Sequence, residues 1–172
     1  MVRCEIIVRY CPQCANELQR RFAHGRVRPV CTKCGYIFFH NPKVAVGVVA
    51  VEDGKILLVR RNVDPQRGLW SYPAGYVDEG ERVEDALRRE VREETNLDLR
   101  LGHLLGVYSE EASPVVFIVY TGTIAGGKAE PGPEVSEVGF FPPNALPPMA
   151  FDHDQRVLKD WALLGTRTTG IL

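Results

Sequence analysis

The sequence has no long hydrophobic run: nowhere do about 18 apolar residues follow one another without interruption, so we expect no membrane-spanning segment. The first ten residues hold too few apolar side chains and too many charges for a signal peptide, and we expect a cytoplasmic protein. The 16 glycines and 12 prolines follow no fixed period, which excludes a fibrous repeat. With 172 residues, 45% of them hydrophobic and 25% charged, the chain has room for one globular domain and a small appendage.

Cysteine is absent beyond residue 34, and four of the five cysteines form two pairs of matched spacing. Two residues separate Cys11 from Cys14 and Cys31 from Cys34, and sixteen residues lie between the pairs. Four thiolates brought together by two tight turns are the ligand set of a structural Zn²⁺ ion, with no coordination position open for chemistry. The alternatives are two disulfides, which a cytoplasmic location disfavours, and a redox pair, which the second matched pair disfavours. Cys4 is left over, and we expect it to be a small strand side chain.

Acidic residues are scarce in the first 43 positions, which hold eight Lys or Arg and two acids and therefore carry a net charge of +6. The rest of the chain holds 13 basic and 20 acidic residues, a net charge of −7. Such a basic surface either is merely solvated or attracts an anion, a phosphate or a nucleic acid. The charge imbalance alone does not choose between these interpretations.

The order of predicted elements favours an α+β fold. Asn41-Pro42 is a turn signal that divides an N-terminal ribbon, residues 1–40, from a larger domain, residues 41–172. Strands are expected where β-branched residues gather, and helices where apolar residues recur at helical spacing. The expected strands are 44–51, 56–60, 70–76, 99–108, 115–124 and 138–141, and the expected helices are 82–95 and 152–164. A mixed sheet with two helices is typical of an α+β protein or an α/β/α sandwich.

The helix expected at 82–95 carries carboxylates on the side that should face the protein. At about 100° per residue, Glu90 and Glu94 fall in the middle of an apolar stripe and Glu93 falls at its edge. The stripe consists of Val83, Ala86, Leu87 and Val91. Like charges four residues apart weaken a helix, and acids late in a helix oppose its dipole. A divalent cation would offset these costs, and carboxylates without a nearby His or Cys favour Mg²⁺ or Mn²⁺ over zinc.

Two other interpretations of these acids stay open. Acidic clusters on helices are usually a solvated face, although here two carboxylates interrupt the apolar stripe. A buried arginine partner, Arg89 or Arg92 of the same helix, would also neutralise them.

These glutamates belong to a longer pattern. Gly75, five residues, Glu81, seven residues and then the run Arg89-Glu90-Val91-Arg92-Glu93-Glu94-Thr95-Asn96-Leu97 resemble the 23-residue Nudix box. The one departure is Asn96, which stands where the box has its final glycine. That position ends the helix and calls for a left-handed backbone, which Asn tolerates best after Gly. The resemblance implies a Nudix-type α/β/α sandwich and hydrolysis of a nucleoside diphosphate linked to another group, X.

Further runs extend the resemblance over nearly the whole chain. A four-cysteine ribbon followed by a Nudix domain is similar to the NADH pyrophosphatase branch, and more similar to the ribbon-bearing ADP-ribose and FAD pyrophosphatases. The matching runs are Cys34-Gly35-Tyr36, Asn41-Pro42-Lys43 and Leu69-Trp70-Ser71-Tyr72-Pro73-Ala74-Gly75. NADH pyrophosphatases carry Ser-Gln-Pro-Trp-Pro-Phe-Pro shortly after the box, and residues 106–115 contain none of it, whereas Pro114 resembles a proline of the ADP-ribose enzymes. The resemblance therefore implies ADP-ribose or FAD as substrate, with AMP and a phosphate monoester as products.

Other functions stay open beside this one. The chain could be an NADH pyrophosphatase, or it could remove nucleotide caps from RNA, with the basic ribbon tracking the RNA chain. A non-catalytic binding module that uses the zinc ribbon as an adaptor is the alternative from another class. A nucleotide is the favoured partner over nucleic acid, and no membrane is expected. The oligomeric state stays open, with a homodimer as one alternative because relatives are often dimers.

The resemblance also implies the metal ligands of the catalytic site. The carbonyl of Ala74 together with Glu90 and Glu94 would hold Mg²⁺ or Mn²⁺, and Glu93 would share a second or third ion. An acid after the long loop commonly completes such a site, and Glu134 matches this position best. Glu93 and Glu134 are both candidates for the general base.

The remaining residues of the box have supporting roles in the family. Glu81 would sit at the helix start, and Arg89 would orient the carboxylates through charge-assisted hydrogen bonds. Gly75 would let the loop backbone approach the metal. A nucleotide base needs a stacking surface, and ordinary core packing is the alternative for any one aromatic residue. The candidates are Tyr76, Trp70 and Phe141.

Overall fold

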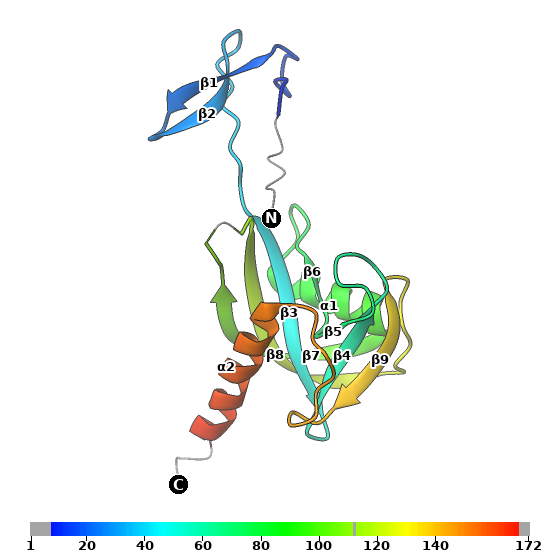
Figure 1. Ribbon diagram of the computed structural model, residues 1–172. Coiled ribbons are helices and arrows are strands. Elements are labelled where there is room, and N and C mark those ends of the chain that lie inside the picture. The colour runs from blue at the N-terminus through cyan, green and yellow to red at the C-terminus, as the bar shows by residue number, and fades with distance from the viewer. Residues whose placement is uncertain (1–7, 112, 169–172) are drawn as a thin grey trace. The chain divides into compact units, whose positions relative to one another are not determined.

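The computed structural model describes residues 8–111 and 113–168 (Figure 1). The chain divides into two compact units, Met1–Asn41 and Pro42–Leu172. The first unit contains one two-stranded antiparallel sheet. Its strands are β1 (Leu18–Ala23) and β2 (Arg26–Cys31).

Two further turns of the first unit carry the paired cysteines. The N–H of Ala15 donates to the carbonyl of Cys11 at 2.8 Å, and the N–H of Gly35 donates to the carbonyl of Cys31 at 3.0 Å. Both residues after the second cysteine have positive φ, 56° at Ala15 and 77° at Gly35. The two cysteine pairs therefore lie on equivalent turns. The left-handed position is occupied by alanine in the first turn and by glycine in the second.

The second unit is built on a seven-stranded mixed sheet. The main path runs β5–β4–β3–β8–β7, while β6 pairs with β3 and β9 pairs with β4. β3 and β8 are parallel, and the other pairs are antiparallel. The strands are β3 (Lys43–Glu52), β4 (Lys55–Arg61), β5 (Trp70–Ser71), β6 (Ala74–Tyr76), β7 (Leu97–Tyr108), β8 (Val115–Gly127) and β9 (Val135–Phe141), and the helices are α1 (Val83–Thr95) and α2 (Asp152–Thr168).

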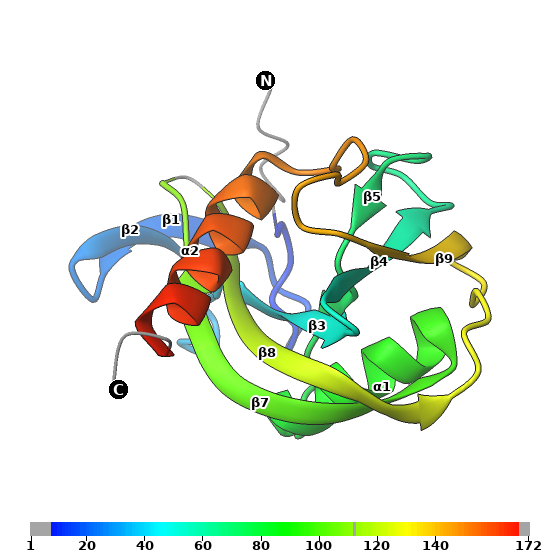
Figure 2. The same cartoon turned by 90° about the horizontal axis from the view of Figure 1, so that it is seen from below.

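Alternate side chains of β3 build a hydrophobic cluster on each face of the sheet. Val48 and Ala50 belong to a cluster with Leu87 of α1, whereas Val49 belongs to one with Val157 of α2. All five side chains are fully buried, as the period of two along a doubly covered strand requires. Figure 2 shows the sheet between the two helices. The α/β/α sandwich that the sequence predicts is confirmed.

Some element limits differ from the expectation. The strand expected at 70–76 is two short strands on either side of Pro73, because proline has no N–H for the ladder: β5 pairs with β4, and β6 pairs with β3. β7 begins at Leu97, directly after the helix, and β9 begins at Val135 rather than at 138. Because β8 also continues to Gly127 rather than ending at 124, the loop between β8 and β9 spans only residues 128–134.

α1 ends as the sequence predicts. Asn96 has φ 57°, in the left-handed region, and its N–H donates to the carbonyl of Arg92 at 2.9 Å. This backbone is the one that the glycine of the Nudix box would supply. In the part of the chain that the structure describes, neither α1 nor α2 combines the length and hydropathy needed to cross a membrane.

Candidate active site

Glu94 joins the last turn of α1 to β6. Its Oε2 accepts a hydrogen bond from the N–H of Ala74 at 3.1 Å. The sequence expectation gives the carbonyl of Ala74 and the carboxylate of Glu94 to one metal site. The structure brings the two residues together, although the group of Ala74 that contacts Glu94 is its N–H. Among the described residues, Glu94 forms no ion pair with an arginine or lysine.

Glu90 lies against the backbone of Gly75. A Cβ atom on Gly75 would overlap the carboxyl carbon and both carboxylate oxygens of Glu90. The φ of Gly75 is not positive, so the residue is required for space and not for a left-handed backbone. The second glutamate of the apolar stripe therefore reaches the same strand as Glu94.

Arg89 donates hydrogen bonds to three glutamates and one backbone carbonyl. It donates to both carboxylate oxygens of Glu81 at 2.9 Å, to Glu90 at 2.7 Å, to Glu93 at 3.2 Å and to the carbonyl of Tyr76 at 3.0 Å. The bidentate bond to Arg89 lowers the pKa of Glu81 to about 2. An arginine partner thus exists for Glu90 and Glu93, and the same contacts suit the orienting role that the resemblance implies.

Glu94 has no comparable cationic partner. Its pKa is raised to about 8, chiefly by burial and also by the negative charges of Glu90 and Glu134, while the N–H of Ala74 and the more distant charge of Arg61 lower it. Burial likewise raises the pKa of Glu90, against the lowering effect of Arg89. Arg92, the second candidate for a neutralising partner, pairs with Asp98 at 2.8 Å instead.

This balance fits a divalent cation. Burial opposes the ionisation of these neighbouring carboxylates, so a nearby positive charge would stabilise their ionised form. Their hard oxygen donors are the ligands that Mg²⁺ and Mn²⁺ prefer. The carboxylates are less convergent than a closed metal cage, since in the described residues only the four cysteines bring three or more ligand atoms within 4.8 Å of one another. The acids therefore form an open site, suited to an ion that also binds substrate.

The loop between β8 and β9 carries Glu134 to this site. The N–H of Gly132 donates to the carbonyl of Glu94 at 3.0 Å, and the N–H of Glu130 donates to the carbonyl of Thr95 at 3.0 Å. A side chain at Gly132 would overlap the carbonyl oxygen of Glu93, so this glycine, which the sequence did not single out, allows the close approach. Glu134 follows two residues later and lines the pocket described next.

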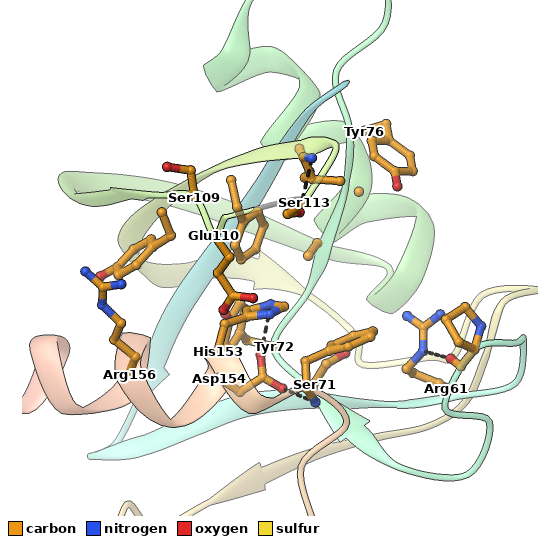
Figure 3. Close-up of a pocket in the computed structure, with 18 of the residues that line it drawn as sticks. Arg61, Ser71, Tyr72, Tyr76, Ser109, Glu110, Ser113, His153, Asp154 and Arg156 are labelled. Atoms are coloured by element: carbon orange, nitrogen blue, oxygen red, sulfur yellow. Dashed lines mark hydrogen bonds and ion pairs between the residues drawn. The ribbon is translucent and has the colours of Figure 1, made fainter. Parts of the chain in front are cut away.

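A pocket of about 550 Å³ adjoins β6 and the start of α2 (Figure 3). Ala74, Gly75 and Tyr76 of β6 line it together with Glu134. Glu93 does not: its side chain is 58% exposed and turned toward Arg89. Of the two candidates for the general base, Glu134 is the one at the pocket.

The three aromatic candidates separate in the structure. Tyr76 lines the pocket with an exposed ring, over which the ammonium group of Lys43 lies at 4.9 Å. Trp70 and Phe141 do not line the pocket and pack edge to face at 4.8 Å between ring centroids. They belong to the cluster on the α2 side of the sheet. The structure places these two rings in core packing.

Sequence reasoning missed the other end of the pocket. The residues there come from β4, β8, the loop before β6 and the start of α2, so only the fold brings them together. They include Arg61, Tyr72, Phe117, His153 and Asp154. Burial and the neighbouring charge of Asp154 raise the pKa of Tyr72, and burial raises the pKa of Asp154. No local motif in the sequence marks this group.

The four cysteines of the first unit lie together. The sulfur distances are 3.6 Å for Cys11–Cys34 and 3.5 Å for both Cys14–Cys31 and Cys14–Cys34, and no disulfide joins them. Tetrahedral zinc with Zn–S bonds of about 2.3 Å needs sulfurs about 3.8 Å apart, so the set fits one zinc ion. The expectation for Cys4 concerns a residue outside those that the structure describes.

Comparison with known proteins places this geometry in a family. The NUDIX domain family matches residues 41–162, and the Nudix N-terminal family, a zinc ribbon, matches residues 9–40. The chain belongs to the Nudix family. The crystal structure of a NUDIX hydrolase from Nitrosomonas europaea is similar to this Nudix hydrolase with a TM-score of 0.86 and 31% identity, covering 94% of this chain and 93% of that one.

Two curated relatives show where this Nudix hydrolase lies within the family. An ADP-ribose pyrophosphatase of Methanocaldococcus jannaschii is 39% identical over 130 residues, which cover 73% of this chain and 76% of the relative. The NAD-capped RNA hydrolase NudC of Vibrio atlanticus is 27% identical over 145 residues, covering 83% of this chain and 52% of the relative. The chain thus spans about half the length of the second relative.

Proposed function

We propose that this Nudix hydrolase cleaves the pyrophosphate bond of ADP-ribose or FAD and releases AMP and a second phosphate monoester. The observation that carries the proposal is the Glu90–Glu94 face of α1, packed on a strand whose Ala74 and Gly75 line a pocket of about 550 Å³. The name of the Methanocaldococcus relative supports ADP-ribose. The absence of the NADH-branch signature from residues 106–115 supports the same substrates.

The carboxylates would have two roles, metal binding and acceptance of a proton. Ala74, Glu90 and Glu94 would hold Mg²⁺ or Mn²⁺, with Glu93 and Glu134 at further positions. Such an ion supplies neutralisation of the pyrophosphate oxygens and a lowered pKa for a water molecule. Glu134 is the better placed residue to accept the proton of the attacking water, because it lines the pocket while Glu93 is held by Arg89.

The other residues of the site position these groups. Arg89 fixes the rotamer of Glu90 and ties the start of α1, through Glu81, to the carbonyl of Tyr76. Tyr76 offers an exposed ring at the pocket edge to a ring of the substrate.

The same proposal covers the rest of the protein. Residues 1–40 form a ribbon in which the four cysteines hold a structural Zn²⁺ ion, and residues 41–172 form the catalytic domain. The protein would act in the cytoplasm on a small nucleotide, with the homodimer of its relatives as one alternative for its oligomeric state.

Hydrolysis of NADH or of nucleotide-capped RNA is the second candidate. The relationship to the Vibrio enzyme and the net charge of +6 on the first 43 residues favour it. Activity on capped RNA and on free dinucleotide should be compared over a salt series, because RNA held through phosphate contacts is released by salt. A steep loss of activity with salt for RNA alone would support this candidate.

A substrate panel with Mg²⁺ and Mn²⁺ tests the main proposal. ADP-ribose, FAD, NADH and a capped RNA are incubated with the full chain, and the products are separated by chromatography. AMP together with a second phosphate monoester from ADP-ribose or FAD is the expected result. No cleavage of any member of the panel with either ion would reject the proposal in favour of a non-catalytic binding module.

A further inference from the structure

The pocket is lined by two buried oxygens whose hydrogen-bonding capacity the rest of the protein does not satisfy. Asp154 and Tyr72 are each 1% exposed, and both line the pocket. Tyr72 and Asp154 interact with each other, since Asp154 adds to the rise that burial causes in the pKa of Tyr72, and Tyr72 opposes the rise that burial causes in the pKa of Asp154. Within the described residues, however, no hydrogen bond of ordinary length and angle reaches Oδ1 of Asp154 or the hydroxyl of Tyr72. Figure 3 shows both side chains at the same end of the pocket. Buried polar atoms in proteins are almost always satisfied, so these two call for an explanation.

Helix capping uses only one of the two carboxylate oxygens of Asp154. Its Oδ2 accepts a hydrogen bond from the N–H of Phe151 at 3.0 Å, and its own N–H donates to the carbonyl of Phe151 at 3.1 Å. This reciprocal pair closes the first turn of α2 and uses one carboxylate oxygen. The other oxygen lies 3.6 Å from Nε2 of His153, beyond hydrogen-bond distance.

Packing does not account for the hydroxyl of Tyr72. The ring lies parallel to that of Phe117, with 6.1 Å between centroids and an interplanar angle of 12°. A phenylalanine would make the same ring contact without burying a polar atom. Apart from its interaction with Asp154, the buried hydroxyl has no polar neighbour that would offset the free-energy cost of its burial.

The surroundings of the two oxygens match a flat heterocycle. The ring of His153 meets Phe117 edge on at 5.4 Å and stacks on Phe151 at 5.2 Å, so aromatic groups enclose this end of the pocket. The carboxylate oxygen accepts a hydrogen bond, and the phenol can donate one. The 6-amino group and the adjacent ring nitrogen of adenine are a donor beside an acceptor, which is the complementary pair.

We propose that Asp154 and Tyr72 form the nucleobase site of this enzyme, in which Oδ1 of Asp154 accepts from the 6-amino group of adenine and the hydroxyl of Tyr72 donates to the adjacent ring nitrogen. This inference rests on the proposed function, since it places the AMP half of the substrate. A 6-oxo purine would turn a carbonyl oxygen toward the carboxylate, so the site selects adenine over hypoxanthine.

Equilibrium binding of AMP and IMP to the full chain, without added divalent ions, tests the site apart from catalysis. We expect the wild-type protein to bind AMP at least about tenfold more tightly than IMP, as a site built to hydrogen-bond one edge of a base should. In Asp154→Asn the amide oxygen can keep the bond to Phe151, and the amide nitrogen then faces the pocket as a donor. The ratio of AMP to IMP affinity should fall at least about tenfold, because that donor suits the 6-oxo group.

Two further variants make the test decisive. Tyr72→Phe removes only the hydroxyl and should weaken AMP several-fold, and it decides the matter if Asp154→Asn does not fold. Asp152→Asn is the same chemical change at the exposed first residue of α2, and it should leave both affinities unchanged. Ribose 5-phosphate serves as a probe without a base, and its binding should not respond to any of the variants.

The outcomes separate this inference from the proposed function. Equal wild-type affinity for AMP and IMP, or a ratio that Asp154→Asn leaves unchanged, would overturn the base site while AMP release from ADP-ribose still stood. Weakened ribose 5-phosphate binding in Asp154→Asn would also overturn the base site, because it would show that Asp154 contacts the sugar phosphate and not the base. If Asp154 governs the ratio but no pyrophosphate is cleaved, the base site stands and the pyrophosphatase activity falls.

Discussion

Glu94 is the residue on which the catalytic proposal depends most directly. Replacing it with Gln keeps an oxygen that accepts the N–H of Ala74 and removes the negative charge. We expect turnover of ADP-ribose to fall at least about a hundredfold, because the charge that would hold Mg²⁺ or Mn²⁺ is lost. Steady-state kinetics give the effect, and circular dichroism checks the fold. Asp85→Asn, an exposed acid on the same helix, is the control and should retain activity.

Unchanged turnover in Glu94→Gln would remove the catalytic interpretation of α1. A loss of equal size in the Asp85 variant would show that the helix tolerates no change of charge, and the assignment to Glu94 would then fail.

The same residue should make stability depend on pH. The pKa of Glu94 in the folded protein is about 8, above the ordinary value of 4.5, so the folded state binds its proton more tightly than the unfolded state does. Stability from this group is therefore complete below about pH 4.5 and declines as the pH rises to about 8. Without added divalent ions, the melting temperature of the wild type should decline across this range more than that of Glu94→Gln. Parallel curves for the two proteins would contradict this.

Gly75 tests the packing of the second glutamate. A methyl group there would overlap the carboxylate of Glu90, so Gly75→Ala must displace that side chain or the strand. We expect a cost of about 1–3 kcal/mol in stability, as for other overpacked sites, and a loss of most activity. Gly126→Ala is the control, since its Cβ would meet only Oδ2 of Asp98 at 3.7 Å. Chemical denaturation and kinetics on both variants check the prediction, which an active Gly75→Ala would refute.

At the scale of elements, the end of α1 depends on the left-handed backbone of Asn96. Asn96→Gly and Asn96→Ala both lose the hydrogen bond from Nδ2 to the carbonyl of Lys128 at 3.1 Å, so comparing them isolates the backbone. The alanine variant should be about 1–2 kcal/mol less stable than the glycine variant in urea unfolding. Equal stability would mean that the turn changes conformation when the side chain is replaced.

Element type followed from local pattern, while element pairing did not. The stripe of Val83, Leu87 and Val91 predicts α1 because helical periodicity is a property of neighbouring residues. Pro73 is a local signal for the break within 70–76, but the partners of the two halves could not be predicted in this way, because pairing depends on strands that are distant in the sequence. The approach of Gly132 to the end of α1 is equally non-local.

At the scale of the whole molecule, one part of the candidate site can be predicted from the sequence and another part cannot. The carboxylates and cysteines lie at short, regular spacings, which physical chemistry can interpret without a fold. Tyr72 and Asp154 lie 82 positions apart and meet only because β5 and the start of α2 flank one pocket. The sequence alone therefore predicts the groups proposed to bind metal, but not the groups proposed to bind the base.

Zinc should stabilise the first unit alone. The second unit has two hydrophobic clusters of its own, whereas the first has a two-stranded sheet and two turns joined at the four sulfurs. Release of zinc with a mercurial should therefore abolish hydrogen-exchange protection in residues 9–41 and leave that of residues 42–168 in place. Cys14→Ser should lose the bound zinc measured by elemental analysis, while Cys4→Ser should keep it. Retained protection in the zinc-free ribbon would contradict this, because it would show that the ribbon folds without the metal.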